Sequence, residues 1–112
     1  MALVLVVDDD PATRARTADS LVAVGYRVRT VPDGRSALAA VDEEQPDAVV
    51  SDAIMPGVDG WSLAAQLRLR SSPVPIVLVS GSGVEPPVHN VRVLTRPVTP
   101  ADLCAAVADV IS

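Results

Sequence analysis

Hydrophobic and polar positions alternate between two patterns along the chain. Amphipathic stretches predict helices at 11–24, 35–44, 61–69 and from 100 to the chain end. Between them lie short runs that favour strands, at 3–7, 27–31, 48–51, 76–79 and 91–94. Strands that alternate with helices are typical of βαβ units and a parallel sheet.

Local signals support these helix boundaries. Asp10-Pro11 and Thr99-Pro100 each pair a preferred N-cap residue with proline at the first helical position, and Gly25 follows the first helix. In the third helix, Leu63, Ala64 and Leu67 form one apolar stripe that we expect to face the core.

The connection between the last two strands is short. Residues 80–90 contain two Gly, two Pro and no helical period. A crossover between parallel strands normally contains a helix. We therefore expect a loop, or at most one helical turn, and a fourth crossover helix that is reduced or absent.

Length and composition indicate one domain over residues 1–112. The chain has 112 residues, of which 49% are hydrophobic, enough to bury a core. The predicted fold class is α/β, a single doubly wound five-stranded parallel sheet with the flavodoxin-like order 2-1-3-4-5. Ligands of such sheets bind at the carboxyl ends of the strands, where the strand order reverses.

Charge and hydropathy argue against two kinds of partner. The net charge of −5 disfavours direct nucleic-acid binding, which needs clustered cations. All nine basic residues are Arg. The apolar runs fall short of the roughly 20 residues that a membrane span needs. Together with a start that lacks a signal-peptide pattern and a single cysteine, this leads us to expect a cytoplasmic protein with no membrane contact.

Acidic residues end two of the predicted strands. Asp8, Asp9 and Asp10 follow the first strand, and Asp52 ends the third. If these strands are neighbours, three carboxylates converge at one sheet edge, where their repulsion calls for a cation. The alternative is that Asp10 caps a helix, Asp8 and Asp9 are solvated, and Asp52 is a turn residue.

Several motifs resemble the receiver domain of two-component response regulators. They are Val6-Val7-Asp8-Asp9, Asp52-x-x-Met55-Pro56-Gly57-x-Asp59-Gly60, a serine (Ser80) at the end of the fourth strand, and Arg96-Pro97 after the fifth. The resemblance covers nearly the whole chain except residues 82–90.

The resemblance implies a role for each site residue. Asp52 would accept a phosphoryl group from a phosphohistidine of a histidine kinase or histidine phosphotransfer protein. Asp8, Asp9, Asp52 and the backbone carbonyl of Ile54 would hold Mg²⁺, and Ser80 would donate its hydroxyl to the phosphoryl group. The domain would then switch conformation and act on a downstream protein effector. It would be a signalling domain, not an enzyme that turns over an external substrate.

Two residues depart from the family pattern. Arg96 stands where the family has Lys, and it could instead be a simple counter-ion to the acids. Val93 stands where the family usually has an aromatic residue, so the usual aromatic switch is not expected in its usual form. The family's loop also suggests a cis Arg96-Pro97 peptide.

Two other functions remain open. A pseudo-receiver, a protein-binding module of the same fold that works without phosphorylation, is favoured by Arg96 and the short crossover. A haloacid dehalogenase-type phosphatase also uses a strand-end Asp and Mg²⁺. In that class, however, the motif is Asp-x-Asp after the first strand, whereas Asp8 and Asp9 are adjacent here.

Overall fold

The computed structural model describes residues 1–70, 72–81 and 89–112, and its centre is a five-stranded parallel sheet. The strand order is β2-β1-β3-β4-β5, as the sequence predicts. The strands are β1 (Leu3–Val7), β2 (Arg27–Val31), β3 (Ala48–Asp52), β4 (Ile76–Ser80) and β5 (Val91–Thr95).

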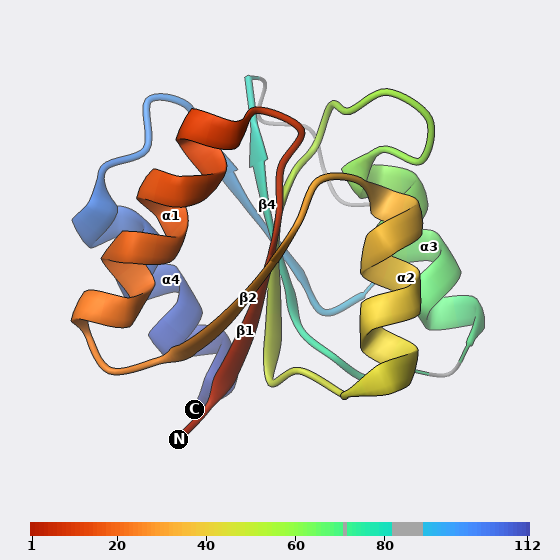
Figure 1. Cartoon of the computed structure of the whole chain (residues 1–112), viewed down its shortest axis with the longest axis horizontal. Coiled ribbons are helices and arrows are strands. Elements are labelled where there is room, and N and C mark those ends of the chain that lie inside the picture. The colour runs from red at the N-terminus through yellow and green to blue at the C-terminus, as the bar shows by residue number, and fades with distance from the viewer. Residues whose placement is uncertain (71, 82–88) are drawn as a thin grey trace.

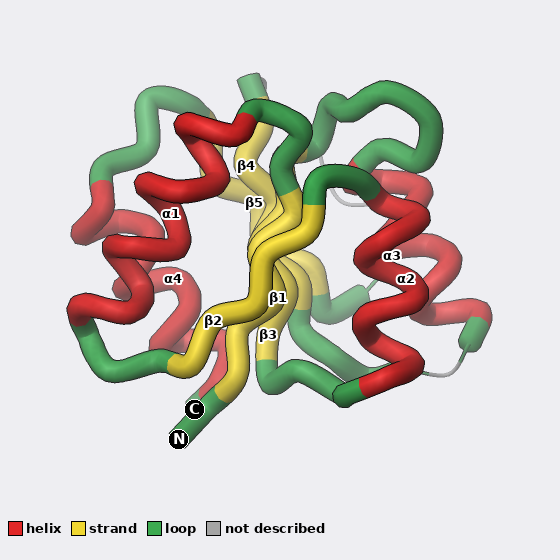
Figure 2. Tube along the Cα trace, viewed as in Figure 1, coloured by secondary structure: helices red, strands yellow, loops and turns green. Residues whose placement is uncertain are grey.

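The four described helices cover both faces of the sheet. Helices α1 (Pro11–Ala23) and α4 (Pro100–Ile111) lie on one face, and α2 (Gly34–Glu43) and α3 (Gly60–Leu69) lie on the other, as Figures 1 and 2 show. The predicted boundaries are right to within about one residue. The predicted loop at 80–90 falls largely on residues 82–88, which are outside the described residues.

The sheet is buried on both faces. In β1, Val4 and Val6 pack in the core beneath α1 and α4, whereas Leu5 and Val7 pack in the core beneath α2 and α3. A strand covered by helices on both faces needs apolar side chains in both directions. This explains the uninterrupted apolar run of β1 in place of an alternating pattern.

The helix caps predicted at Asp10 and Thr99 are confirmed. The carboxylate of Asp10 accepts a hydrogen bond from the backbone N–H of Thr13, and Asp59 caps the start of α3 in the same way. Thr99 forms a capping box with Asp102 at the start of α4. These caps set the points where the chain leaves the carboxyl end of the sheet and turns into a helix.

Arg68 ties together loops at the opposite, amino end of β4 and β5. Its guanidinium donates hydrogen bonds to the backbone carbonyls of Ser72 (2.8 Å), Val74 (2.8 Å), His89 (3.0 Å) and Asn90 (3.1 Å). Burial lowers the pKa of Arg68 from its ordinary high value. One side chain thus fixes where β5 begins relative to β4.

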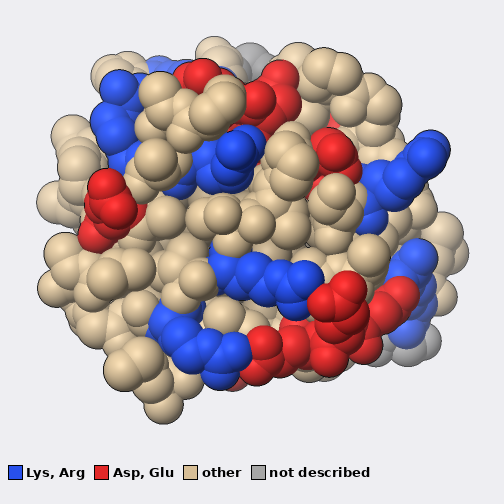
Figure 3. All heavy atoms as spheres, viewed as in Figure 1, with Lys and Arg blue, Asp and Glu red and all other residues tan. Residues whose placement is uncertain are grey.

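Basic and acidic side chains meet along the lower part of the face seen in Figure 3. Arg27 and Arg29 on β2 form ion pairs of 2.6 and 2.8 Å with Glu44 and Glu43, next to one another at the end of α2. Exposed pairs of this kind contribute little to stability. In the described part of the chain, every helix falls short of the length and apolarity that a bilayer span requires.

Gly60 allows α3 to approach the sheet closely beneath the acidic edge. A Cβ added there would lie 2.4 Å from the carbonyl oxygen of Asp52. Gly60→Ala should therefore lower the free energy of unfolding by about 1–3 kcal/mol in a urea titration, since backbone must move to make room. The matched control is Gly81→Ala, where a Cβ would meet nothing within 4 Å. Equal stability of the two variants would contradict the close approach.

Candidate functional site

The register of β1 against β3 brings the strand-end acids together. Val7 pairs with Ser51, so Asp8 and Asp52 follow side by side at the carboxyl edge of the sheet. One carboxylate oxygen from each of Asp8, Asp9 and Asp52 lies within 4.8 Å of the others. The convergence that the sequence predicts is therefore present in the structure.

Both oxygens of the Asp52 carboxylate have a partner. Oδ1 accepts a hydrogen bond from the backbone N–H of Ile54 at 3.2 Å, and Oδ2 lies 3.0 Å from Nη2 of Arg96. Only 16% of the Asp52 side chain is exposed, against 45% of Arg96. Arg96 is thus a counter-ion of Asp52 in this state, as one of the two sequence-based interpretations expected.

Asp8 is the most buried of the acids. Its Oδ1 accepts a hydrogen bond of 2.9 Å from the backbone N–H of Asp10, while its carbonyl oxygen accepts one of 2.8 Å from Arg14. Burial raises the pKa of Asp8; the backbone bond from Asp10 opposes this, and the charges of Asp52 and Asp9 raise the pKa further. Without a cation, the site therefore disfavours the fully ionised form of its carboxylates. A bound cation would reverse this preference.

The carboxyl ends of β4 and β5 complete the site. Ser80 is buried and pairs with Thr95 in the sheet, and the N–H of Arg96 donates to the Ser80 carbonyl at 2.8 Å. The Arg96-Pro97 peptide is cis, as predicted. Ser80, the last residue of β4, and Arg96, the first residue after β5, thus lie at the same sheet edge as the acids.

The loop after Asp52 holds the chain close to the sheet. The N–H of Ala53 donates to the Val79 carbonyl at 2.9 Å, and Met55 is buried, whereas Ile54 is 69% exposed. Gly57 has a φ of 76°, a left-handed conformation that favours glycine. Met55 and Gly57 of the loop motif therefore have structural roles. The proposed ligand role of the Ile54 carbonyl stays a prediction.

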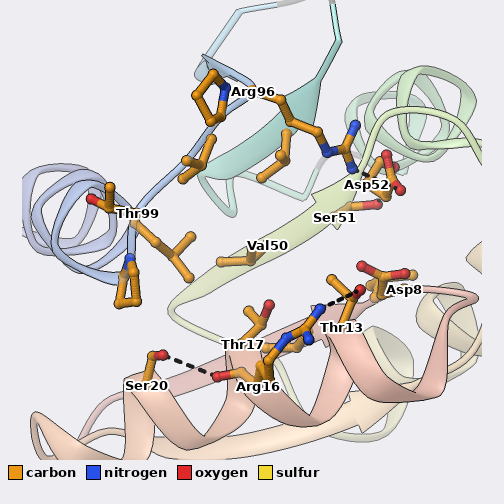
Figure 4. A pocket seen from close by; sticks show the side chains of 17 residues that line it. Asp8, Thr13, Arg16, Thr17, Ser20, Val50, Ser51, Asp52, Arg96 and Thr99 are labelled. Atoms are coloured by element: carbon orange, nitrogen blue, oxygen red, sulfur yellow. Dashed lines mark hydrogen bonds and ion pairs between the residues drawn. The ribbon is translucent and has the colours of Figure 1, made fainter.

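A cavity of about 400 Å³ extends from the acids down between α1 and α4. Asp8, Asp52 and Arg96 line one end, and Val50 lies on its floor, as Figure 4 shows. Nothing in the sequence motifs indicated this space, because it results from several small side chains on different elements.

The family model that describes the response regulator receiver domain matches residues 4–108. The chain belongs to the response regulator receiver domain family. This match and the observed strand order confirm the resemblance inferred from the Asp8-Asp9 pair and the loop after Asp52.

Curated relatives of this receiver domain are longer proteins. The transcriptional regulatory protein TcrA of Mycobacterium tuberculosis is 42% identical over 80 residues, which is 71% of this chain and 32% of TcrA. The sensor histidine kinase RcsC of Salmonella typhimurium is 37% identical over 82 residues, 73% of this chain and 9% of RcsC. The chain thus spans about a third or less of the length of these relatives.

Solved structures agree with the fold over the full length. The chemotaxis response regulator CheY4 of Vibrio cholerae has a TM-score of 0.90 and 30% identity, covering 98% of both chains. The receiver domain of the hybrid histidine kinase CckA has a TM-score of 0.85 and 31% identity, covering 98% of this chain and 99% of that one.

Three further residues lie outside the acidic cluster. Trp61 is half-buried against the core beneath α2 and α3, and Cys104 packs against the other core. His89 is exposed, and only its carbonyl takes part in the Arg68 network. No sequence motif pointed to Arg14, whose hydrogen bond to the Asp8 carbonyl holds the turn into α1.

The raised pKa of Asp8 predicts a pH-dependent stability in metal-free buffer. The folded protein holds this proton more tightly than the unfolded chain does, so stability decreases as the pH rises through the folded pKa. Asp8→Asn keeps the acceptor for the Asp10 N–H but has no charge. It should therefore be more stable than the wild type at neutral pH, and this advantage should shrink in acid.

Urea titrations of both proteins at several pH values measure this difference. Asp19→Asn, an exposed acid on α1, is the matched control and should show little change. A variant Asp8→Asn that is less stable than the wild type at neutral pH would contradict the electrostatic assignment.

Proposed function

We propose that this receiver domain takes a phosphoryl group onto Asp52 from a phosphohistidine of a histidine kinase or histidine phosphotransfer protein. The observation that carries the proposal is the cluster of Asp8, Asp9 and Asp52 beside the Arg96 guanidinium at one sheet edge. In the proposed step, a carboxylate oxygen of Asp52 forms the new P–O bond. The P–N bond of the donor breaks, and its electron pair returns to the imidazole nitrogen.

The donor set supports Mg²⁺ as the cofactor. Three carboxylates, together with the carbonyl of Ile54 two residues after Asp52, would offer the oxygen ligands that Mg²⁺ prefers. When bound, the ion would neutralise charge on the transferring group. Asp8 and Asp9 would hold the ion from the end of β1. The raised pKa of Asp8 indicates a carboxylate whose ionised form a nearby cation would stabilise.

Arg96 and Ser80 would stabilise the product. Arg96 can leave the Asp52 carboxylate and pair with the added phosphoryl oxygens, because a guanidinium offers two donors in one plane. Ser80, buried at the end of β4, would donate its hydroxyl to a third oxygen. This shift of Arg96 and Ser80 is the conformational signal that we propose for a downstream protein effector.

The proposal has consequences for the class and location of the protein. Its role would be signalling without turnover of an external substrate, over a single domain of residues 1–112. Since its proposed partners carry phosphohistidine made from ATP, we place it in the cytoplasm. A pseudo-receiver remains the second candidate, because the Arg96–Asp52 ion pair already neutralises the acceptor in the unmodified protein.

A phosphodonor experiment distinguishes the two functions. Acetyl phosphate with Mg²⁺ should add the mass of one phosphoryl group to the wild type, and Asp52→Asn should remove the adduct. Asp59→Asn is the control that keeps modification, because Asp59 caps α3 and asparagine caps equally well. Intact mass spectrometry measures the adduct, with Trp61 fluorescence as a second reading. A wild type that stays unmodified by both acetyl phosphate and beryllofluoride would favour the pseudo-receiver.

Magnesium binding can be measured without phosphorylation. At ten times its dissociation constant, Mg²⁺ should raise the free energy of unfolding by about 1.4 kcal/mol, because it binds the folded site only. Asp9→Asn, a change at an exposed position, should greatly reduce this gain. Asp19→Asn should keep it. Equal Mg²⁺ stabilisation in all three proteins would exclude the acidic cluster as the binding site.

A further inference from the structure

The cavity between α1 and α4 has Asp8, Asp52 and Arg96 at one end, polar side chains on its α1 wall, and several apolar side chains on the remaining walls. Val50, Val79, Val98 and Leu103 contribute apolar surface from the sheet, the loop after β5 and α4. The α1 wall carries instead Thr13, Arg16, Thr17 and Ser20. A volume of about 400 Å³ is within the range of small-molecule pockets in proteins.

The space exists because α1 lacks an apolar stripe on this side. Leu21 is the one buried residue of the helix. A helix that packs on a sheet usually has apolar residues at spacings of three and four. Here Thr13, Thr17 and Ser20 occupy those spacings, and their short side chains leave the cavity unfilled.

Two polar groups on the α1 wall lack strong partners. Arg16 forms no salt bridge with any described residue, and its guanidinium donates one hydrogen bond of 3.3 Å, to the hydroxyl of Thr13. Among the described contacts, the Thr17 hydroxyl has no hydrogen bond, and it points toward Val50 in Figure 4. In contrast, Arg96 on the opposite wall of the cavity is engaged by Asp52, as Figure 4 shows.

We propose that this cavity binds a small apolar carboxylate. Its carboxylate would pair with the Arg16 guanidinium and accept a hydrogen bond from Thr17, since a guanidinium matches a carboxylate in charge and shape. Its hydrocarbon part would contact Val50 and Leu103. Arg16 is the cation of the α1 wall, and the second cation that lines the cavity, Arg96, is already paired with Asp52. The site goes beyond the phosphoacceptor function and uses residues that phosphotransfer does not need.

Three matched probes test the charge and the shape of the ligand. Phenylacetate, phenylacetamide and phenethylamine share one apolar group and differ in charge. Titrations of the full chain in metal-free buffer, followed by two-dimensional NMR, should show the tightest binding for phenylacetate. The expected advantage over the neutral amide is about tenfold. Shifted amide signals should cluster at Thr17, Val50 and Leu103.

Variants on α1 locate the site. Arg16→Gln should reduce phenylacetate binding to the level of the amide. Ser20→Leu fills the cavity with a good helix former and should abolish binding, whereas Ser20→Ala should keep it. Circular dichroism confirms that each variant is folded. The proposal is overturned by undetectable binding of phenylacetate at millimolar concentration, by equal binding of the three probes, or by unchanged binding in Ser20→Leu. Because metal and phosphodonor are absent, these outcomes are independent of the phosphoacceptor proposal.

Discussion

The parallel pairing of β1 with β3 is the constraint on which the site depends. Each strand is buried on both faces and its register is fixed by backbone hydrogen bonds, so the residues just beyond Val7 and Ser51 must lie at the same height. Both of these positions are occupied by aspartate. The fold therefore holds negative charges close together, and the stability of the two cores maintains an arrangement that electrostatics alone would separate.

The surrounding residues moderate this repulsion to different degrees. Arg96 faces Asp52 directly at 3.0 Å, whereas Arg14 bonds only to the backbone carbonyl of Asp8. Asp8 is thus buried without a direct cationic partner for its carboxylate among the described residues, and its pKa rises. The site is neutralised on the side of the acceptor and left acidic on the side of β1. Such an asymmetry suits a cation held mainly by Asp8 and Asp9.

Sequence patterns predicted the fold and the acids well, because both depend on local rules. Strand and helix boundaries follow from hydrophobic period and capping, and strand order follows from the βαβ topology. The ion pair between Asp52 and Arg96 was one of two open interpretations, since the direction of a long side chain is decided by tertiary contacts. The four carbonyl contacts of Arg68 and the cavity beside α1 gave no sequence signal. Each depends on backbone or space contributed by elements far apart in the chain.

Arg68 makes the geometry of the site independent of the connection that precedes β5. Its guanidinium fixes the chain at Val74 and again at His89 and Asn90, just before β4 and β5 begin. From Val91 onward the ladder with β4 determines the path to Arg96. The crossover can therefore gain or lose residues during evolution, or accept a grafted peptide, while the cation facing the acceptor keeps its place.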